Sequence, residues 1–284
     1  MWVADKWTDF EVIDCSSGEK LERWGQYTLI RPDPQVIWHT QKSENLWQKP
    51  SARYDRSKTG GGAWQINNLP AIFQVSYKNL RFALKPMGFK HTGLFPEQAV
   101  NWDFMQKAIK NAGREITVLN LFAYTGAASL ACSAAGAKVC HVDASKGMVS
   151  WAKENAVLNG ISDIRFIVDD CLKFVEREIR RGKKYDAIIM DPPSYGRGPN
   201  GEVWKLEDEL HNLLNTCLSV LSDKPLFFIL NSYTTGLGAA CMKYMLEATV
   251  QKKFGGRVEA DEIGLPVKVS SGVLPCGTTA RWIG

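Results

Sequence analysis

The sequence lacks long apolar runs, and we expect no secretory leader; both points narrow the class of protein. Its longest apolar runs have the length of a strand, which is too short to span a membrane. The N-terminus, MWVADKWTDFEVIDC, has no basic region, apolar stretch or small-residue cleavage site. We therefore expect a cytoplasmic protein with no membrane partner.

Paired cysteines are also missing. The seven cysteines are odd in number, and no two have the CxxC spacing. This pattern disfavours a disulfide framework and a zinc site, so we expect no bound metal. We expect buried, reduced thiols, except at Cys276, which can act as a nucleophile only if the fold brings it to an active site.

The positive charge is confined to one segment. Residues 1–41 contain four basic and seven acidic groups. Residues 42–90 contain nine basic and two acidic groups, whereas residues 91–284 are nearly balanced, with 22 basic and 21 acidic groups. The basic segment also contains five aromatic residues, Trp47, Tyr54, Trp64, Phe73 and Tyr77. Basic groups interleaved with aromatics suit the phosphates and bases of a nucleic acid. A solvated loop above core aromatics has the same pattern, so both interpretations stay open.

The first 90 residues differ in rhythm from the rest. Short apolar runs separated by turn residues, without a helical period, predict a small β-rich domain over residues 1–90. We expect its strands at FEVIDC, KLERWG, YTLIRPDP, VIWH, AIFQVSY and LRFALKP. We expect a mobile loop at QKSENLWQKPSARYDRSKTGGG.

From Pro96 onward, apolar strands alternate with helices, and residues 91–284 are expected to form an α/β domain. The expected helices are 96–113, 127–135, 145–159, 171–181, 203–221 and 238–254. This alternation predicts a mostly parallel sheet covered on both faces. The runs RVEADEIGLPV and GVLPCGTTARWI have no helix between them, so we expect an antiparallel pair at the C-terminus.

Polar residues end successive strands at the edge where such sheets bind ligands. The turn NLFAYTGAAS contains only Gly126, so the GxGxxG pattern of dinucleotide sites is absent. Asp143 can accept hydrogen bonds from both hydroxyls of a ribose, and Asp170 can accept from an adenine amino group. Either carboxylate can instead cap the helix that follows it. The set predicts a site for an adenosine without a pyrophosphate, as in S-adenosylmethionine.

The run YDAIIM ends abruptly in Asp191-Pro192-Pro193. Proline cannot continue a central strand, so a rigid turn is expected at the ligand edge. Its carbonyl groups can accept from an amino group on a base, and Tyr195 can stack on that base. Positioning accounts for most of the catalysis, because a sulfonium is already an activated methyl donor. We therefore predict that Asp191, Pro192, Pro193 and Tyr195 are catalytic.

Four segments together point to a family. VLNLFAYTGAASLACSAAGAKVCHVDAS, FIVDDCLKF, YDAIIMDPPSY and GFKHTGLFPEQ resemble bacterial 23S rRNA methyltransferases that modify cytosine at C5 or guanine at N7. The resemblance implies a class I S-adenosylmethionine-dependent methyltransferase fold, with a seven-stranded mostly parallel sheet and an antiparallel C-terminal hairpin. It implies RNA as the partner. The cofactor-binding residues that it implies are Phe95, Gln98, Asn120, Phe122, Ala123, Tyr124, Thr125, Gly126, Asp143, Ala144, Asp170, Cys171 and Asp191.

The chain departs from that family at two places. Glu97-Gln98-Ala99 stands where the family has Asp-Gln-Arg, and Asn231-Ser232 stands where the cytosine-C5 members have a cysteine. Such a thiolate must add to C6 before C5 can attack the methyl group, so cytosine-C5 chemistry is doubtful. The methylated atom and the oligomeric state stay open. A methyltransferase acting on a protein or small molecule, and an inactive RNA-binding relative, are the alternatives.

Overall fold

The computed structural model describes residues 1–57, 61–197, 201, 203–234 and 236–284, and the chain divides into two compact units. The larger unit comprises Met1, Asn101–Glu262 and Gly277–Gly284. The smaller unit comprises Trp2–Val100 and Ile263–Cys276, so the C-terminal strands contribute residues to both. The domain boundary expected after residue 90 stays a prediction.

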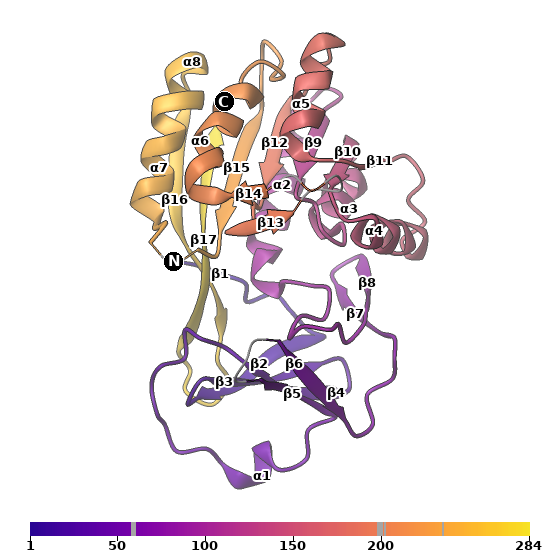
Figure 1. Ribbon diagram of the computed structural model, residues 1–284, viewed down its shortest axis with the longest axis vertical. Coiled ribbons are helices and arrows are strands. Elements are labelled where there is room, and N and C mark those ends of the chain that lie inside the picture. Colours follow the sequence, from indigo (N-terminus) through magenta and orange to yellow (C-terminus); the bar gives the residue numbers. More distant parts are fainter. Residues whose placement is uncertain (58–60, 198–200, 202, 235) are drawn as a thin grey trace. The chain divides into compact units, whose positions relative to one another are not determined.

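The described residues form an eight-stranded sheet with the order β1-β16-β17-β15-β12-β9-β10-β11 (Figure 1). Its strands are β1 (Trp2–Val3), β9 (Thr117–Leu121), β10 (Lys138–Asp143), β11 (Arg165–Val168), β12 (Ala187–Met190), β15 (Phe227–Ser232), β16 (Arg257–Pro266) and β17 (Val273–Ile283). The five strands from β15 to β11 pair in parallel, and β17 runs antiparallel to β15. The expected α/β sheet is confirmed, and the short β1 is added beside β16.

Helices cover both faces of this sheet. They are α2 (Ala99–Asn111), α3 (Ala127–Ala134), α4 (Lys146–Leu158), α5 (Cys171–Arg180), α6 (Leu206–Cys217) and α7 (Ala239–Leu246). One face packs on α5, α6 and α7 through a continuous buried cluster that includes Leu121, Phe174 and Leu213. Alternate residues point to the opposite face, where Asn120 of β9 donates to Ser129 of α3. No helix among the described residues is long and apolar enough to cross a membrane.

Three predicted helices have different bounds. The helix expected over 203–221 begins at Leu206, because Val203–Lys205 forms β14, antiparallel to β13 (Tyr195–Arg197). The helix expected over 238–254 is α7, followed by a π-helical segment η2 (Glu247–Gln251) and α8 (Lys252–Phe254). The helix expected from residue 96 opens with a 3₁₀ turn, η1 (Pro96–Gln98).

The smaller unit is β-rich, as predicted. Its five-stranded sheet consists of β2 (Phe10–Ser16), β3 (Glu19–Trp24), β4 (Tyr27–Pro32), β5 (Ala52–Arg56) and β6 (Gly62–Ile66). A separate pair consists of β7 (Phe73–Tyr77) and β8 (Leu80–Leu84).

Two expectations for this unit are wrong. The run VIWH forms no strand, and the predicted mobile loop contains α1 (Glu44–Trp47) and β5. Only alternate residues of β5, Ala52 and Tyr54, are buried, so the segment looks polar in sequence.

The prediction for the thiols is also wrong at one position, since Cys241 is exposed while the other six cysteines are buried.

Candidate active site

The carboxyl ends of the central strands meet at one edge. In the sheet register, Leu121 of β9 lies beside Val142 of β10 and Met190 of β12. Neighbouring strands lie roughly 4.8 Å apart. Asp143, the last residue of β10, and Asp191, which follows β12 directly, therefore lie at the same level on either side of β9. This edge is where the sequence predicted the ligand.

The turn after β9 has an unusual backbone that Asp143 holds in place. Phe122 and Tyr124 have φ values of 53° and 52°, in the left-handed region that non-glycine residues rarely adopt. The Tyr124 N–H donates to Asp143 Oδ2 at 2.9 Å. Gly126 has φ 92°, and a Cβ there would lie 3.0 Å from Ala152 Cβ. Glycine is thus required at this position by its φ and by the packing against α4.

Asp143 keeps acceptor capacity after these contacts. Its Oδ1 accepts from the Ser145 N–H at 2.8 Å, while Ser145 itself caps α4 by accepting from Met148. A carboxylate has about four lone-pair sites, so two hydroxyl donors of a ribose can still be accommodated. Burial raises the pKa of Asp143, and the two backbone N–H groups oppose that rise. The donor and acceptor balance of this residue fits the nucleoside part of S-adenosylmethionine.

The third strand end joins the same edge. The Asp169 N–H donates to the Asp143 carbonyl at 3.1 Å. Asp170 is the N-cap of α5 and accepts from the Lys173 N–H at 3.0 Å, so the capping alternative is realised for it. Cys171 begins the helix, and the first N–H groups of a helix have no intrahelical partner. The carboxylate oxygen can accept from the adenine amino group, and the N–H beside it can donate to a ring nitrogen.

The thiol of Cys171 has a structural role. Its Sγ accepts from the Phe122 N–H at 3.4 Å, which ties α5 to the turn after β9. Burial raises the pKa of this thiol well above its usual range. The thiol therefore stays protonated and cannot serve as a nucleophile.

A buried polar chain lies on the other face of the sheet. Asn120 donates to Ser129 Oγ at 2.9 Å, and Ser129 Oγ lies 3.0 Å from His141 Nδ1. Burial lowers the pKa of His141 to about 3, so its ring is neutral, and its Nε2 has no partner among the described residues. The side-chain amide of Asn120 thus supports α3, and its expected contact with the cofactor stays a prediction.

The Asp-Pro-Pro turn is held by the hairpin that follows it. The Pro193 carbonyl accepts from Trp204 Nε1 at 2.6 Å, and the Ser194 carbonyl accepts from the Leu206 N–H at 3.1 Å. The indole of Trp204 also packs on Phe122, with ring centroids 5.0 Å apart. One side chain therefore joins the turn after β9 to the Asp-Pro-Pro turn. Trp204 does not stand out in the sequence, because the pattern there predicts a helix over 203–221.

A cavity of about 750 Å³ borders that turn. It is lined by Ser194, Tyr195, Lys205, Leu206, Glu207, Leu210, His211, Thr234, Gly236, Leu237 and Met245. Tyr195 is 53% exposed, and Ser194 Oγ lies 2.6 Å from Thr234 Oγ1. Tyr195 and His211 both line this cavity, although the sequence gave no reason to single out His211. The lining thus offers an aromatic ring, an imidazole and hydroxyl groups.

No activated cysteine lies at the end of β15. Asn231 accepts from Asn101 Nδ2 at 3.0 Å, and Ser232 Oγ accepts from the Thr234 N–H at 3.1 Å. Cys276 belongs to the smaller unit, where its thiol donates to the Leu274 carbonyl at 3.4 Å. Burial raises the pKa of Cys276 well above its usual range, which disfavours the thiolate form.

Phe95 and Gln98 also belong to the smaller unit. Gln98 lies in η1 and is buried, and Phe95 lies half-buried with its ring 5.3 Å from that of His91. Burial lowers the pKa of His91 to about 4, with a further effect from Arg31. Their expected contact with the cofactor stays a prediction.

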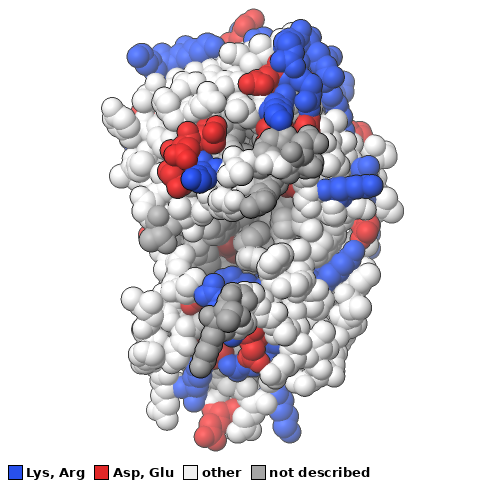
Figure 2. Space-filling view, in the orientation of Figure 1, with Lys and Arg blue, Asp and Glu red and all other residues white. Residues whose placement is uncertain are grey.

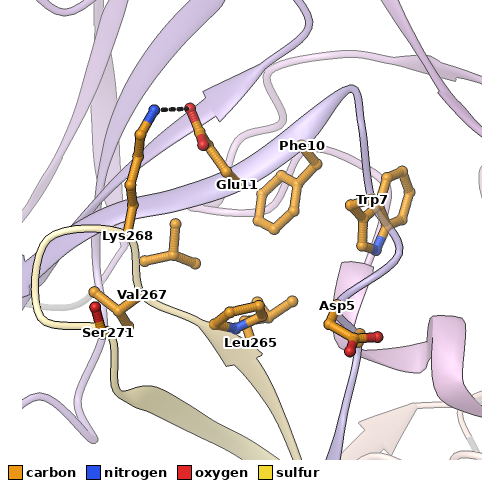
Figure 3. Close-up of a pocket in the computed structure, with 11 residues that line it drawn as sticks. Asp5, Trp7, Phe10, Glu11, Leu265, Val267, Lys268 and Ser271 are labelled. Atoms are coloured by element: carbon orange, nitrogen blue, oxygen red, sulfur yellow. Dashed lines mark hydrogen bonds and ion pairs between the residues drawn. The ribbon is translucent and has the colours of Figure 1, made fainter.

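The smaller unit has a cavity of its own, of about 310 Å³ (Figure 3). Its walls include Trp7, Phe10 and Leu265. The charged groups at its rim neutralise each other, since Glu11 Oε1 lies 3.2 Å from Lys268 Nζ and 2.9 Å from Arg23 Nε. We assign the active site to the strand ends of the larger unit, where polar groups converge.

A mostly parallel sheet with helices on both faces and an antiparallel strand β17 beside β15 is the architecture of a class I methyltransferase. A family model described as S-adenosylmethionine-dependent methyltransferase matches residues 17–221, and the chain belongs to this family. A crystal structure of the SAM-dependent methyltransferase from Agrobacterium tumefaciens is 37% identical, with a TM-score of 0.94, covering 99% of this chain and 92% of that one.

Curated relatives carry a more specific name. The ribosomal RNA large subunit methyltransferase K/L of Shewanella baltica is 34% identical over 235 residues, covering 78% of this chain and 31% of that protein. The protein of the same name from Pseudoalteromonas atlantica is 31% identical over 177 residues, covering 61% of this chain and 23% of that protein. The chain therefore spans less than a third of the length of these relatives.

Proposed function

We propose that this methyltransferase transfers a methyl group from S-adenosylmethionine to a base of large-subunit ribosomal RNA. One observation carries the proposal: Trp204 joins the turn held by Asp143 to the turn that borders the cavity at Tyr195. A cofactor site and an acceptor site on one edge is the arrangement that in-line methyl transfer requires. The relatives named as ribosomal RNA methyltransferases support RNA as the acceptor.

In this proposal the strand ends bind the cofactor. Asp143 accepts from the ribose hydroxyls, and Asp170 and the Cys171 N–H bind the adenine. The turn of residues 120–126 holds the methionine end, with Ala144 as a further contact. S-adenosylmethionine supplies a methyl group already activated on a sulfonium, so the chain's task is to bind, orient and exclude water.

The acceptor base binds at the Asp-Pro-Pro turn and the adjoining cavity. Tyr195 stacks on its face, and Asp191 and the Pro192 carbonyl accept from its amino group. The hairpin engages the carbonyls of Pro193 and Ser194. Asn231 and Ser232, rather than a cysteine, end β15, and this favours an acceptor nitrogen over cytosine C5. A base within a helix must first be extruded, which costs a few kcal/mol.

A basic surface on α5 supports a phosphate-bearing partner. Figure 2 shows Lys and Arg side chains gathered over α5, at the upper right of the view. Residues 173–184 contain six basic groups against two acidic ones, and Arg180, Arg181, Lys183 and Lys184 are exposed. In the segment first considered for RNA, by contrast, Tyr54, Phe73 and Tyr77 are buried. The phosphate contacts are therefore assigned to α5, and base stacking by these three aromatics is disfavoured.

The direct test is transfer of a trideuterated methyl group. The protein is incubated with S-adenosylmethionine labelled in its methyl group and with large-subunit RNA from cells lacking this gene. We expect one labelled nucleoside by mass spectrometry. Tyr195→Ala should lower kcat/KM for RNA roughly tenfold, because base stacking is worth about 1–3 kcal/mol. Tyr244→Ala, on a ring that is 71% exposed in the same unit, is the matched control. Label appearing only in protein or in small molecules would contradict the proposal.

A further inference from the structure

The basic surface on α5 contains one acidic residue whose charge is balanced inside the protein. The side chain of Glu178 is completely buried. Its carboxylate accepts from Arg165, Arg181 and the Tyr185 hydroxyl at 3.1, 2.9 and 2.6 Å. Burial alone would raise the pKa of Glu178, but these three donors outweigh it and lower the pKa. The carboxylate is therefore ionised and fully paired, and it does not neutralise the cations that follow it in the chain.

Those cations keep their charges at the surface. The side chains of Arg180 and Lys183 are exposed and form no ion pair with any other residue that the structure describes. Lys184 Nζ donates to the Ser219 carbonyl at 2.8 Å, a neutral partner. We call Arg180, Arg181, Lys183 and Lys184 the basic end of α5. Figure 2 shows it as a gathering of Lys and Arg side chains.

The backbone of the basic end is held in one conformation. Gly182 has φ 64°, and its N–H donates to the Ile179 carbonyl at 3.0 Å. The Lys183 N–H donates to the Glu178 carbonyl at 2.9 Å. This pair of hydrogen bonds is the Schellman motif that closes many helices. The cations are thus presented from an ordered helix end, so binding a ligand there has a smaller entropic cost.

Helix stability alone does not explain the basic end. Cations in the last turn stabilise a helix through its dipole, and Arg177 and Arg180 already occupy that turn. Lys183 and Lys184 follow the helix, where this effect has fallen off. A surface charge without a partner inside the protein is available to an anionic partner outside it.

The basic end lies at the edge of the larger unit opposite to the strand ends. Cys171 begins α5 beside the turn after β9, and the ten residues of α5 rise about 15 Å at 1.5 Å per residue. The strands span a similar distance. The Asp186 N–H donates to the carbonyl of Thr117, the first residue of β9, whereas Asp191 follows the end of β12. Five residues at roughly 3.3 Å each separate these two aspartates by about 16 Å.

We propose that the basic end binds the phosphate backbone of the substrate RNA at a point about 15 Å or more from the methylated base. The proposal rests on the proposed function and specifies its substrate as an RNA segment long enough to reach both edges of the larger unit. A duplex advances roughly 3.4 Å per base pair, so the segment extends about five base pairs beyond the target. Phosphate contacts are independent of base sequence, so the basic end sets affinity and position without choosing the base.

The test removes two unpaired charges from the whole chain in Arg180→Gln/Lys183→Gln. Binding to intact large-subunit RNA from cells lacking this gene should weaken roughly tenfold or more, and the slope of log affinity against log salt should become shallower by about two, one for each lost phosphate contact. KM for this RNA should rise by the same factor. The kcat at saturating RNA and the calorimetric affinity for S-adenosylmethionine should stay at their wild-type values.

Two further variants isolate the charge effect. Lys183→Gln/Lys184→Gln leaves α5 itself unchanged and should give the same shift in slope. The matched control is Lys107→Gln/Lys110→Gln, which removes two exposed lysines that are also three residues apart. They lie on α2, which contacts α3 on the other face of the sheet. This control should bind RNA with the wild-type slope.

A second probe tests the distance. The same RNA is digested to fragments of about three nucleotides, which at roughly 3.4 Å per nucleotide are too short to reach the basic end from the strand ends. Wild type and Arg180→Gln/Lys183→Gln should act on these fragments with equal and low kcat/KM. Wild-type activity as high on the fragments as on intact RNA would overturn the proposal.

Binding and methylation are read separately, so the two proposals can fail separately. If intact RNA acquires methyl label while both variants of the basic end keep the wild-type salt slope, the proposed function stands and the role of the basic end is wrong. If no RNA is labelled but these variants lose slope relative to the α2 control, the basic end binds RNA and the methyl acceptor has been assigned wrongly.

Discussion

Replacing Asp143 with alanine is expected to weaken S-adenosylmethionine binding by roughly 100-fold or more. Hydrogen bonds to a charged acceptor are worth about 1.5–3 kcal/mol each, and two ribose hydroxyls lose theirs. The same change removes the hydrogen bond that the Tyr124 N–H donates to the carboxylate at 2.9 Å. The left-handed turn after β9 loses this support. Isothermal titration calorimetry with S-adenosylhomocysteine measures the loss without turnover.

The matched control for this variant is Asp163→Ala. Asp163 is an exposed aspartate of the same unit that accepts from Ser133 Oγ at 3.0 Å. Its removal should leave the cofactor affinity unchanged. Asp143→Asn should fall between wild type and alanine, because the amide keeps one acceptor oxygen and loses the charge. An Asp143→Ala variant that is folded and binds within threefold of wild type would refute the assignment.

Glu22→Ala should lower the free energy of unfolding by about 3–5 kcal/mol, the usual cost of removing one partner of a buried ion pair. The carboxylate accepts from Arg31 at 2.7 and 2.8 Å and from Trp24 Nε1 at 3.2 Å. Its loss leaves a buried guanidinium without its counter-charge. Urea unfolding followed by circular dichroism gives the value.

The stability that Glu22 contributes depends on pH, and the direction follows from its lowered pKa. Burial alone would raise the pKa of Glu22, but Arg31 and Lys20 outweigh it and lower the pKa to about 2. A folded-state pKa below the unfolded value of roughly 4.3 gives stability that is fully present above pH 4.3 and is lost as the pH falls toward 2. The difference in stability between wild type and Glu22→Ala should therefore shrink in that window.

The double variant Glu22→Leu/Arg31→Leu separates charge from packing. It removes both members of the pair and leaves Lys20 beside Asp33, with 3.3 Å between Nζ and Oδ2. Stability should recover to within about 1 kcal/mol of wild type, as buried pairs replaced by apolar residues usually show. A double variant as unstable as Glu22→Ala would show that the unpaired charge of Arg31 is not the cause of the lost stability.

The sheet and its polar strand ends could be predicted because they depend on local patterns. The alternation of apolar strands and helices fixes a parallel sheet, and carboxylates that follow successive strands must then share an edge. The register of β9, β10 and β12 places Asp143 and Asp191 there. Caps were also visible in outline, since Ser145 and Asp170 stand directly before helices.

The features that sequence reasoning missed depend on contacts between distant segments. Val203–Lys205 reads as the start of an amphipathic helix, and it becomes a strand only by pairing with Tyr195–Arg197. Hydrogen bonds from Trp64 and Arg31 to loop carbonyls leave no mark on the sequence, because any residue has a carbonyl. The net charge of residues 91–284 does not reveal the basic surface of α5, because acidic groups elsewhere in that range balance its positive charge.

The most direct test of the central assignment is to find where the cofactor lies on the protein. Ultraviolet irradiation with methyl-labelled S-adenosylmethionine, followed by peptide mapping, identifies the chain segments in contact with it. The strand-end site predicts label in the peptides that contain residues 120–126, 143–145, 170–171 or 191–195. Label confined to the cavity between Asp5 and Lys268 (Figure 3), with none at the strand ends, would contradict the account.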